Sequence, residues 1–319
     1  MTAWKDEISA AARRIAPFAR RTPVMQAVDL GLVIPVDLKL EHLQHTGSFK
    51  ARGAFNTLLN SQVPEAGIVA ASGGNHGAAV AYAAARLGKK ARIYVPEMAG
   101  PAKIALIKEQ GADLIVVPGD YSGALAAARA YEAQTGAMQI HAYDAPMTVI
   151  GQGTVMHEWD EQGLAADTVL IAVGGGGLIA GALAWLQGTR RVIAVEPELA
   201  PTLNRALAQG PDTMVEVGGV AANALGATRI GTICYDLARA QGITSLTVPD
   251  AAIVEAQTRL WRQMRALVEP AGATALAALL CGAYKPAPGE RVAVLICGGN
   301  IAPDPLTPDV AVRRADAQA

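Results

Sequence analysis

The stretch Thr46-Gly47-Ser48-Phe49-Lys50 decides how the rest of the chain is interpreted. It follows the apolar run 36–40, which predicts a buried strand, and precedes residues 51–59, whose composition and spacing predict a helix. A lysine at the opening of a helix lies where amide donors and a positive partial charge converge. The ammonium form is disfavoured there, so we expect the pKa of Lys50 to be lowered. A single lysine is more often a surface charge, but a nucleophilic amine at this position suits Schiff-base chemistry.

Length and composition indicate an α/β enzyme. The 319 residues are 51% hydrophobic and 17% charged, and they include 33 glycines, which allow close packing and tight turns. A chain of this length forms one large domain or two smaller lobes with a shared core. The formal net charge is −1 and there is no basic run, which makes nucleic acids and anionic membranes poor partners.

Targeting signals and disulfides are not indicated either. Residues 1–21 lack the apolar core of a signal peptide, and glycine, proline or a charge interrupts every apolar run elsewhere. The three cysteines, Cys234, Cys281 and Cys297, are odd in number and far apart, which does not suggest a disulfide framework. We therefore expect a cytoplasmic protein.

Short β-branched runs alternate with helical stretches rich in alanine and leucine. Further strands are expected at residues 67–71, 91–95, 114–117, 168–173, 192–195 and 292–296, and helices at 6–19, 76–87, 101–110, 121–134 and 151–162. Alternation at this spacing predicts βαβ units and mostly parallel sheets with helices on both faces. Pro and Gly punctuate the chain at 146–151. We therefore expect a small domain of residues 67–147 and a large domain of residues 1–66 and 148–319, with a cleft between them.

A second cluster, Ser72-Gly73-Gly74-Asn75-His76-Gly77, connects an expected strand to an alanine-rich helix. Its glycines let the backbone approach a ligand, and the helix N-terminus behind them favours an anion such as a carboxylate. Asn75 offers both a donor and an acceptor. The same residues would also form a tight turn capped by Ser72 and Asn75, with His76 packed in the core, and the cluster alone leaves both interpretations open.

A third cluster, Gly174-Gly175-Gly176-Gly177-Leu178, lies between an expected strand and an expected helix. Consecutive glycines cost stability through backbone entropy, so packing alone is an insufficient reason for them. Successive backbone N–H groups in such a loop form a concave site that suits a phosphate. Gly175, Gly177 and Ala180 also fit the weaker G-x-G-x-x-A dinucleotide pattern, with Glu196 about twenty residues further on. A nicotinamide oxidoreductase is therefore a rival interpretation of this cluster.

The fourth cluster, Cys297-Gly298-Gly299-Asn300, follows the last expected strand. A thiol at the carboxyl end of a central parallel strand lies where ligands bind in open α/β sheets, although a free cysteine is as often a small buried hydrophobe. Glu269 precedes Pro270 at the opening of another helix, where it would serve a site or favour the helix N-terminus.

Together these clusters resemble the fold-type II pyridoxal phosphate enzymes, and among them the serine/threonine dehydratase and serine racemase group. The resemblance extends from Arg21-Thr22-Pro23 to Asn300 and includes Lys39-Leu40-Glu41, the stretch 46–54 and the clusters above, in order. A coincidental match at all these places is negligible, so the isolated dinucleotide pattern is set aside. The resemblance implies a two-lobed α/β architecture like that of the tryptophan synthase β subunit, with the cofactor in the cleft between domains.

The resemblance also implies a role for each matching residue. Lys50 would bind the aldehyde of pyridoxal 5'-phosphate as a Schiff base and remove the α-proton of the substrate, with Phe49 against the pyridine ring. Asn75 would hydrogen-bond the 3-oxygen of the cofactor. The phosphate would be held by Gly174, Gly175, Gly176, Gly177 and Leu178. Cys297 would lie beside the pyridine nitrogen, where a thiol leaves the ring a weaker electron sink than a carboxylate would. The substrate carboxylate would be held by Ser72, which we also count as catalytic, and by Gly74, Asn75 and His76.

These features favour β-elimination of an L-β-hydroxy amino acid, L-threonine or L-serine first, to a 2-oxo acid and ammonia. Racemases of this group carry a second serine where this chain has Gly73, which has no proton to give, so an amino-acid racemase is the less favoured alternative. Where many relatives have an Ala-Asp-Gly string associated with a divalent metal, this chain has Gly218-Gly219-Val220-Ala221, and no metal is expected near Glu216.

The sequence leaves the side chain of the amino-acid substrate open. Serine, threonine, 3-hydroxyaspartate and bulkier 3-hydroxy amino acids of the phenylserine type are all compatible with the motifs. Residues that meet the β-substituent are expected in loops such as 225–228 or 142–147. A homodimer is expected from the resemblance alone.

Overall fold

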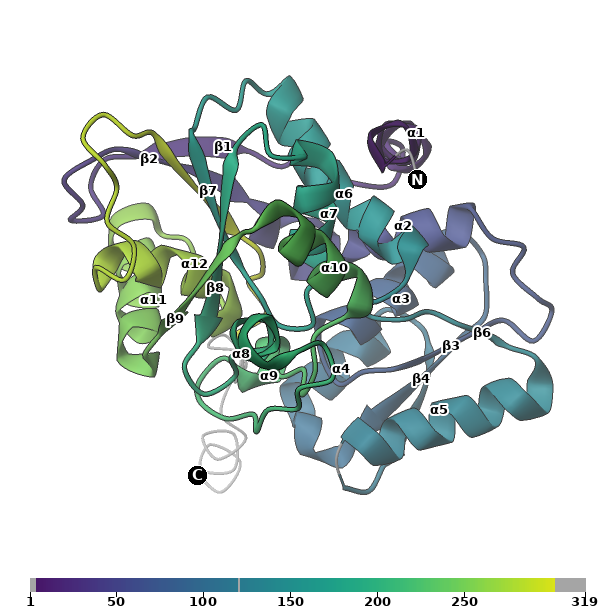
Figure 1. The fold of residues 1–319 in the computed structure, drawn as a ribbon. Helices are drawn as coiled ribbons and strands as arrows, with labels where there is room; N and C mark the ends of the chain where they lie inside the picture. The colour runs from purple at the N-terminus through teal and green to yellow at the C-terminus, as the bar shows by residue number, and fades with distance from the viewer. Residues whose placement is uncertain (1–3, 120, 302–319) are drawn as a thin grey trace, which may run out of the picture.

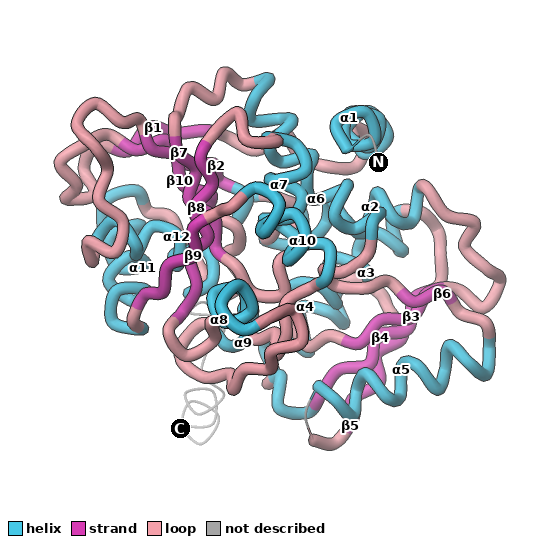
Figure 2. The backbone as a smooth tube through the Cα atoms, in the orientation of Figure 1, coloured by secondary structure: helices cyan, strands magenta, loops and turns pink. Residues whose placement is uncertain are grey.

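The computed structural model describes residues 4–119 and 121–301, and these residues build two β-sheets flanked by helices (Figures 1 and 2). The larger sheet has six strands in the order β1–β2–β10–β7–β8–β9, and the smaller has four in the order β5–β4–β3–β6. In this part of the chain, β1 runs antiparallel to β2, and the other neighbouring strands pair in parallel. The predicted, mostly parallel α/β arrangement is therefore observed.

The bounds of the strands and helices are as follows. The larger sheet consists of β1 (Val24–Ala27), β2 (Val36–Leu40), β7 (Thr168–Ala172), β8 (Arg191–Pro197), β9 (Thr244–Val248) and β10 (Val292–Ile296). The smaller sheet consists of β3 (Ile68–Ala71), β4 (Ala91–Pro96), β5 (Asp113–Val117) and β6 (Met138–Gln139). The helices are α1 (Trp4–Ile15), α2 (Lys50–Leu59), α3 (Asn75–Arg86), α4 (Pro101–Glu109), α5 (Tyr121–Thr135), α6 (Pro146–Glu161), α7 (Gly177–Leu186), α8 (Thr202–Gln209), α9 (Ala222–Leu225), α10 (Thr232–Gln241), α11 (Asp250–Met264) and α12 (Pro270–Leu280).

Alternate residues of the smaller sheet face helices on opposite sides. Val69 packs with Ala124 and Ala128 of α5, whereas the next residue, Ala70, belongs to the apolar cluster that includes α3. This is the period of two that a buried strand requires. Figure 1 shows the same sandwich for the larger sheet, with α6, α7 and α10 on one side and α11 and α12 on the other. Both sheets are therefore covered on both faces, as parallel sheets require.

Three helices pack through glycines where they cross. Gly53 of α2 lies against Gly151 of α6, where an added Cβ would come within 2.6 Å of the Gly53 Cα. Gly153 of α6 lies against Gly181 of α7, where an added Cβ would be 2.4 Å from the Gly153 nitrogen. These contacts join main chain to main chain, because no side chain fits between the helices at these points. Backbone contacts therefore set the distance of α2 from α6 and the distance of α7 from α6.

We expect Gly181→Ala to lower the free energy of unfolding by about 1–3 kcal/mol, because the methyl group would overlap the α6 backbone. Urea unfolding followed by circular dichroism measures this change. Gly218→Ala is the control, since the nearest atom would be 3.9 Å from its Cβ and no loss is expected. Equal stability of the two variants would contradict main-chain packing at this crossing.

Two predicted helix ends were wrong. The first helix ends at Ile15 rather than residue 19, because Pro17 lacks an N–H and restricts the residue before it. The helix predicted from residue 151 begins at Pro146, since proline suits the first helical turn. The predicted domain division at residues 67 and 147 stays a prediction, and its segments 1–3 and 302–319 lie outside the described residues.

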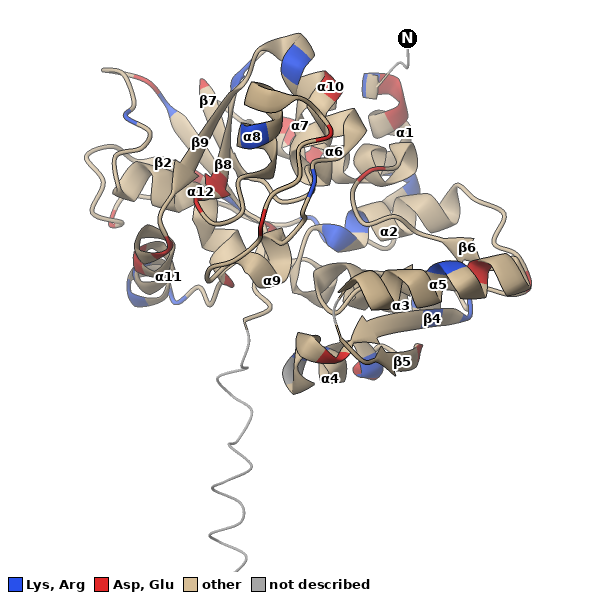
Figure 3. Cartoon of the chain, turned by 60° about the horizontal axis from the view of Figure 1, so that its bottom comes forward, with Lys and Arg blue, Asp and Glu red and all other residues tan. Residues whose placement is uncertain are grey.

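Acidic and basic residues are interspersed along the chain in the view of Figure 3. Among the residues that the structure describes, no helix combines the length and the apolar character that crossing a bilayer would need.

Candidate active site

A pocket of about 460 Å³ opens where the carboxyl ends of β7 and β10 meet the first residues of α2, α3 and α7. Open α/β sheets bind ligands at this edge. The lining includes all nine residues predicted to hold the cofactor, at positions 49, 50, 75, 174–178 and 297. The other predicted residues, Ser72, Gly74 and His76, lie outside the lining.

Lys50 begins α2 and is partly buried at the pocket. Its Nζ donates a hydrogen bond to the Ala142 carbonyl, 2.7 Å away, and lies 5.2 Å from the centre of the Phe49 ring. Burial lowers the pKa of Lys50 to about 8, although the nearby Cys297 and Glu269 raise it. The lowered pKa agrees with the prediction, but desolvation is its largest cause. An amine with this pKa is a base and nucleophile near neutral pH.

The loop before Lys50 is joined to the end of β10. The backbone N–H of Phe49 donates to the Cys297 carbonyl at 3.3 Å, and the N–H of Gly299 donates to the Gly47 carbonyl at 2.8 Å. Thr46 has a φ of 59°, which is a strained conformation for a β-branched residue. Its carbonyl accepts a hydrogen bond from the Asn300 amide at 2.7 Å. These contacts fix the backbone from which Lys50 projects.

The glycine loop 174–177 ends at the N-terminus of α7, whose first-turn N–H groups lack partners within the helix. Gly176 has a φ of 92°, a conformation that favours glycine. Packing also accounts for the glycines: an added Cβ would be 2.4 Å from the Tyr143 ring at Gly175 and 2.5 Å from the Cys234 sulfur at Gly176. Packing is thus one reason for these glycines, and the prediction that they also serve a phosphate stays a prediction.

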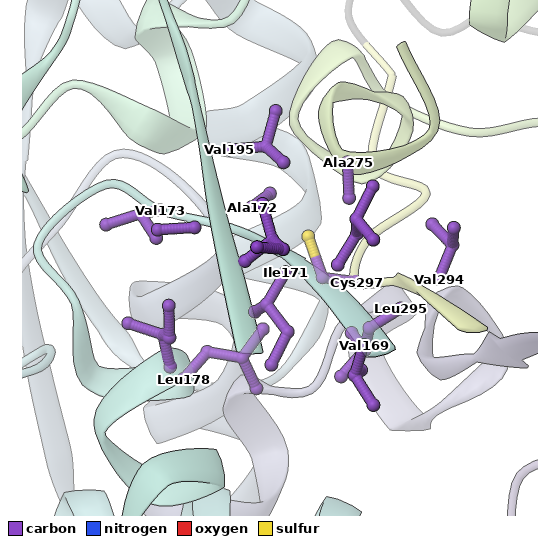
Figure 4. Close-up of a cluster of buried hydrophobic side chains, with 14 of the residues drawn as sticks. Val169, Ile171, Ala172, Val173, Leu178, Val195, Ala275, Val294, Leu295 and Cys297 are labelled. Atoms are coloured by element: carbon purple, nitrogen blue, oxygen red, sulfur yellow. The ribbon is translucent and has the colours of Figure 1, made fainter. Parts of the chain in front are cut away.

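Cys297 lies directly after β10 and is 3% exposed. Figure 4 shows its side chain among apolar residues, with Ala172 and Ala275 nearby. The thiol faces the Ala271 carbonyl at 3.5 Å, and burial raises its pKa above the ordinary value. The sulfur therefore remains a neutral thiol, which neither protonates nor charges a group placed beside it.

Asn75 and Glu269 form a polar pair in the lining of the same pocket. The Asn75 amide donates to Glu269 Oε1 at 2.5 Å, and its oxygen accepts from the Asn300 amide at 2.8 Å. Glu269 is 3% exposed, and burial raises its pKa to about 7 while the Asn75 hydrogen bond, Lys103 and Lys50 lower it. Both Asn75 hydrogen-bonding groups are thus engaged by the protein, and Glu269 would be neutral part of the time near pH 7.

The loop 72–76 has a more mixed arrangement than predicted. Ser72 Oγ accepts a hydrogen bond from the Gly74 N–H at 3.2 Å. His76 is buried, its Nε2 lies 2.9 Å from the Ile140 carbonyl, and burial lowers its pKa to about 3. The neutral His76 ring therefore faces the core. His76 can therefore contribute only its backbone N–H to a ligand, together with the other first-turn N–H groups of α3.

Several pocket residues had no motif to reveal them. Tyr143 and Leu225 line the pocket and come from the two segments in which substrate contacts were expected, whereas Ala224, which also lines it, lies just before the second segment. Lys103, from α4, was not predicted at all, although it is a buried lysine close to Gly74. Within the described residues, no group of three or more His, Cys, Asp or Glu side chains is arranged to hold a metal ion.

Glu196, the acidic residue of the rival dinucleotide pattern, is fully buried away from a ligand. Its carboxylate accepts hydrogen bonds from the backbone N–H groups of Leu203 and Asn204 at 2.7 Å and from Ser245 Oγ at 2.6 Å. It therefore stabilises the start of α8. A ribose would find no free oxygen here, so the pattern lacks its recognition group.

Comparisons with known proteins agree with this geometry. A model of the family described as pyridoxal-phosphate dependent enzyme matches residues 15–298. The chain is 37% identical over 294 residues to a phenylserine dehydratase from Ralstonia pickettii, a match that covers 90% of each chain. It resembles the solved structure of a threonine deaminase from T.th., with a TM-score of 0.87, 37% identity and coverage of 94% of this chain and 99% of that one. It also resembles maize serine racemase, with a TM-score of 0.87, 30% identity and coverage of 99% of each chain.

The residues around the pocket fit the cofactor of this family. An amine with a lowered pKa, main-chain donors at a helix N-terminus and a neutral thiol suit an aldehyde, a phosphate and a ring nitrogen respectively. The comparisons confirm the predicted fold class and the predicted cofactor, pyridoxal 5'-phosphate. The chain is an enzyme that belongs to the pyridoxal-phosphate dependent family of fold type II.

Proposed function

We propose that this enzyme dehydrates an L-β-hydroxy amino acid, L-threonine or L-serine first, to a 2-oxo acid and ammonia. The observation that carries this proposal is the amine of Lys50, whose pKa is lowered to about 8, in one pocket with the glycine loop 174–177. A base near its own pKa at neutral pH is what removal of an α-proton needs. The names of the relatives, a phenylserine dehydratase and a threonine deaminase, support the same reaction class.

The pocket residues would divide the work as follows. Bound pyridoxal phosphate supplies a carbonyl carbon for the substrate amine and an electron sink. Lys50 Nζ would take the α-proton, and the N–H groups of residues 174–178 would hold the phosphate at the start of α7. The first turn of α3, behind Ser72 and Gly74, would hold the substrate carboxylate. Loss of the β-hydroxyl as water then yields an enamine, which takes up water and releases ammonia and the 2-oxo acid.

The lining of the pocket favours an uncharged β-substituent. Tyr143, Ala224 and Leu225 are neutral, and the ionisable side chains of the lining are otherwise Lys50, Glu269 and the thiol of Cys297. The second carboxylate of 3-hydroxyaspartate would face the carboxylate of Glu269, and the two negative charges would repel each other. Threonine, serine and bulkier apolar analogues of the phenylserine type are therefore the better substrates.

The experiment that tests this function measures 2-oxo acid release from L- and D-β-hydroxy amino acids by the enzyme with pyridoxal phosphate. Release from L-threonine, L-serine or L-phenylserine supports dehydration and ranks the substrates. Cofactor binding without release from any member of the panel would contradict it and move the reaction to racemisation or β-replacement.

The pH dependence of turnover should report the ionisation of Lys50. We expect kcat to rise with pH and level off above about 8, because only the neutral amine accepts a proton. Glu269→Gln should move this limb to lower pH, since the negative charge of Glu269 raises the pKa of Lys50. A kcat that is flat on both sides of pH 8, or that falls with pH there, would contradict Lys50 as the base.

Racemisation is opposed by the space around Gly73 as well as by its missing hydroxyl. A Cβ at Gly73 would lie 2.4 Å from the Cβ of Ala99. We therefore expect Gly73→Ser alone to give no serine racemisation, whereas Gly73→Ser with Ala99→Gly admits the hydroxyl and gives measurable D-serine. Chiral chromatography after incubation with L-serine reads the difference, with Ala99→Gly alone as the control. Racemisation by the single Gly73→Ser variant would contradict the steric argument.

Two further expectations belong to this proposal. We propose a homodimer, supported by the resemblance to the dehydratase and racemase group, and light scattering of the purified enzyme measures it. A cytoplasmic location rests on the sequence features described above.

A further inference from the structure

Lys103 is a buried charge that the proposed reaction has not used. It is the third residue of α4 and is 6% exposed, so little of the residue meets water. Burial lowers its pKa, against the negative charge of Glu269, which raises it. Buried charges in proteins are normally paired, because an unpaired one is costly. The burial of a lysine at this position is therefore a feature that needs an explanation.

The hydrogen bonds of Lys103 leave room for a ligand. Among the residues that the structure describes, its partner is the Asn223 carbonyl, 3.2 Å from Nζ, and no carboxylate forms an ion pair with it. A lysine ammonium carries three donors, so the protein uses one and leaves the others for an acceptor. An anion that entered beside Nζ would meet a full positive charge in a region of low dielectric.

The position of Lys103 next to Gly74 indicates which anion would bind there. Its Nζ lies 3.8 Å from where a Cβ on Gly74 would be, and the Asn223 carbonyl lies 3.4 Å from the same point. Gly74 is the N-cap of α3, and Asn223 belongs to α9, whose neighbouring residues Ala224 and Leu225 line the pocket. The ammonium group therefore lies beside the loop at which the substrate carboxylate is proposed to bind. The absence of a side chain at Gly74 keeps the space between them open.

We propose that Lys103 binds the α-carboxylate of the amino-acid substrate and is a specificity-determining residue for α-amino acids over amines without a carboxylate. The proposal rests on the proposed function in so far as the substrate is an amino acid. Main-chain N–H groups at a helix N-terminus contribute a partial positive charge, and Lys103 adds the full charge that balances a carboxylate.

Equilibrium binding of glycine and glycinamide tests this without turnover. Both amines displace the Lys50 amine from the bound cofactor, and the absorbance of the cofactor reports the binding. In Lys103→Met we expect glycine to bind about 10- to 100-fold more weakly, while glycinamide changes by less than about threefold, because only glycine loses a charged hydrogen bond. Lys103→Arg, which keeps the charge, should retain most of the preference for glycine. Lys108→Met, an exposed lysine of the same helix, is the matched control.

Two outcomes would overturn the assignment. Weaker binding of both amines to Lys103→Met by the same factor would mean that Lys103 merely joins α4 to α9. An unchanged preference for glycine in that variant would exclude a contact with the carboxylate. Methionine replaces the buried charge by an apolar side chain of similar length, so the variant is expected to fold.

The outcome for Lys103 is separable from that for the reaction. An enzyme that prefers glycine to glycinamide through Lys103, but forms no 2-oxo acid from any β-hydroxy amino acid, would support the Lys103 assignment and contradict dehydration. Release of 2-oxo acid with an unchanged preference in Lys103→Met would do the reverse.

Discussion

Lys50→Ala should lower kcat for 2-oxo acid formation by at least about 10³-fold, because one side chain is both the covalent anchor of the cofactor and the base. Its amine has a pKa of about 8, whereas the thiol of Cys297 stays neutral and Glu269, whose pKa is about 7, is a weaker base whose Oε1 already accepts the Asn75 amide. Neither can replace it as the acceptor of the α-proton. The loss should therefore appear in kcat for every substrate that the enzyme accepts.

Mass spectrometry after borohydride treatment separates this role from a loss of folding. Reduction turns the carbon–nitrogen double bond between cofactor and lysine into a stable amine, so the wild-type chain should carry the cofactor mass on Lys50. Lys50→Ala should carry none, while Lys89→Ala, at an exposed lysine, should behave as wild type. Turnover by Lys50→Ala within about tenfold of wild type would contradict the assignment.

Arg52→Ala should lower the free energy of unfolding by about 3–5 kcal/mol, because it leaves the buried carboxylate of Glu41 without its partner and removes one partner of Glu158. The Arg52 guanidinium is 2% exposed and contacts both oxygens of Glu41, at 2.9 and 2.7 Å, and one oxygen of Glu158, at 3.0 Å. Lys39 completes the network with a contact of 2.5 Å to Glu158. Denaturant unfolding at neutral pH measures the loss, with the exposed Arg13→Ala expected within about 0.5 kcal/mol of wild type.

The decrease of the free energy of unfolding at acidic pH gives a second measurement of this network. Burial would raise the pKa of Glu158, but Arg52 and Lys39 together hold it below its ordinary value. A group whose pKa is lowered in the folded state stabilises above its unfolded pKa, and this contribution disappears as pH falls through the folded pKa. The free energy of unfolding of Arg52→Ala should therefore fall less steeply than that of wild type as the pH is lowered. An unchanged decrease at acidic pH together with unchanged stability at neutral pH would mean that the network contributes little.

The sequence predicted the helices and strands whose apolar residues recur with a helical or strand period. Strands β2, β3, β4, β5, β7, β8 and β10 and helices α1 to α6 lie within a few residues of where the patterns indicated. β6 has only two residues, and β1 is a short antiparallel strand with an exposed middle, so neither has a run of apolar residues to recognise. Their strand state comes from pairing with β3 and β2, which is a tertiary effect.

The same distinction applies to the site. Lys50, Cys297 and the glycine loop lie at ends of elements that sequence patterns locate, and the fold brings them to one pocket. Tyr143 and Lys103 lie in segments without a motif, so only the folded chain reveals that they approach Gly175 and Gly74. His76 illustrates the opposite case, since its position at a helix start was recognised but its ring turns to the Ile140 carbonyl. Which way a side chain faces depends on neighbours that are distant in sequence.

The glycine contacts among α2, α6 and α7 bear on how this enzyme can diverge. Lys50 is the first residue of α2, and the glycine loop leads directly into α7, so the amine and the phosphate-binding donors stand on two helices that α6 joins backbone to backbone. Side chains elsewhere in the core can then change size without altering the distance between the Lys50 amine and the N–H groups of the glycine loop. Tyr143, Ala224 and Leu225 are outside those helix crossings, so a change in their side chains leaves the crossings intact. A lineage can thus exchange one amino-acid substrate for another by drift in the pocket wall, while the geometry that handles the cofactor is inherited unchanged.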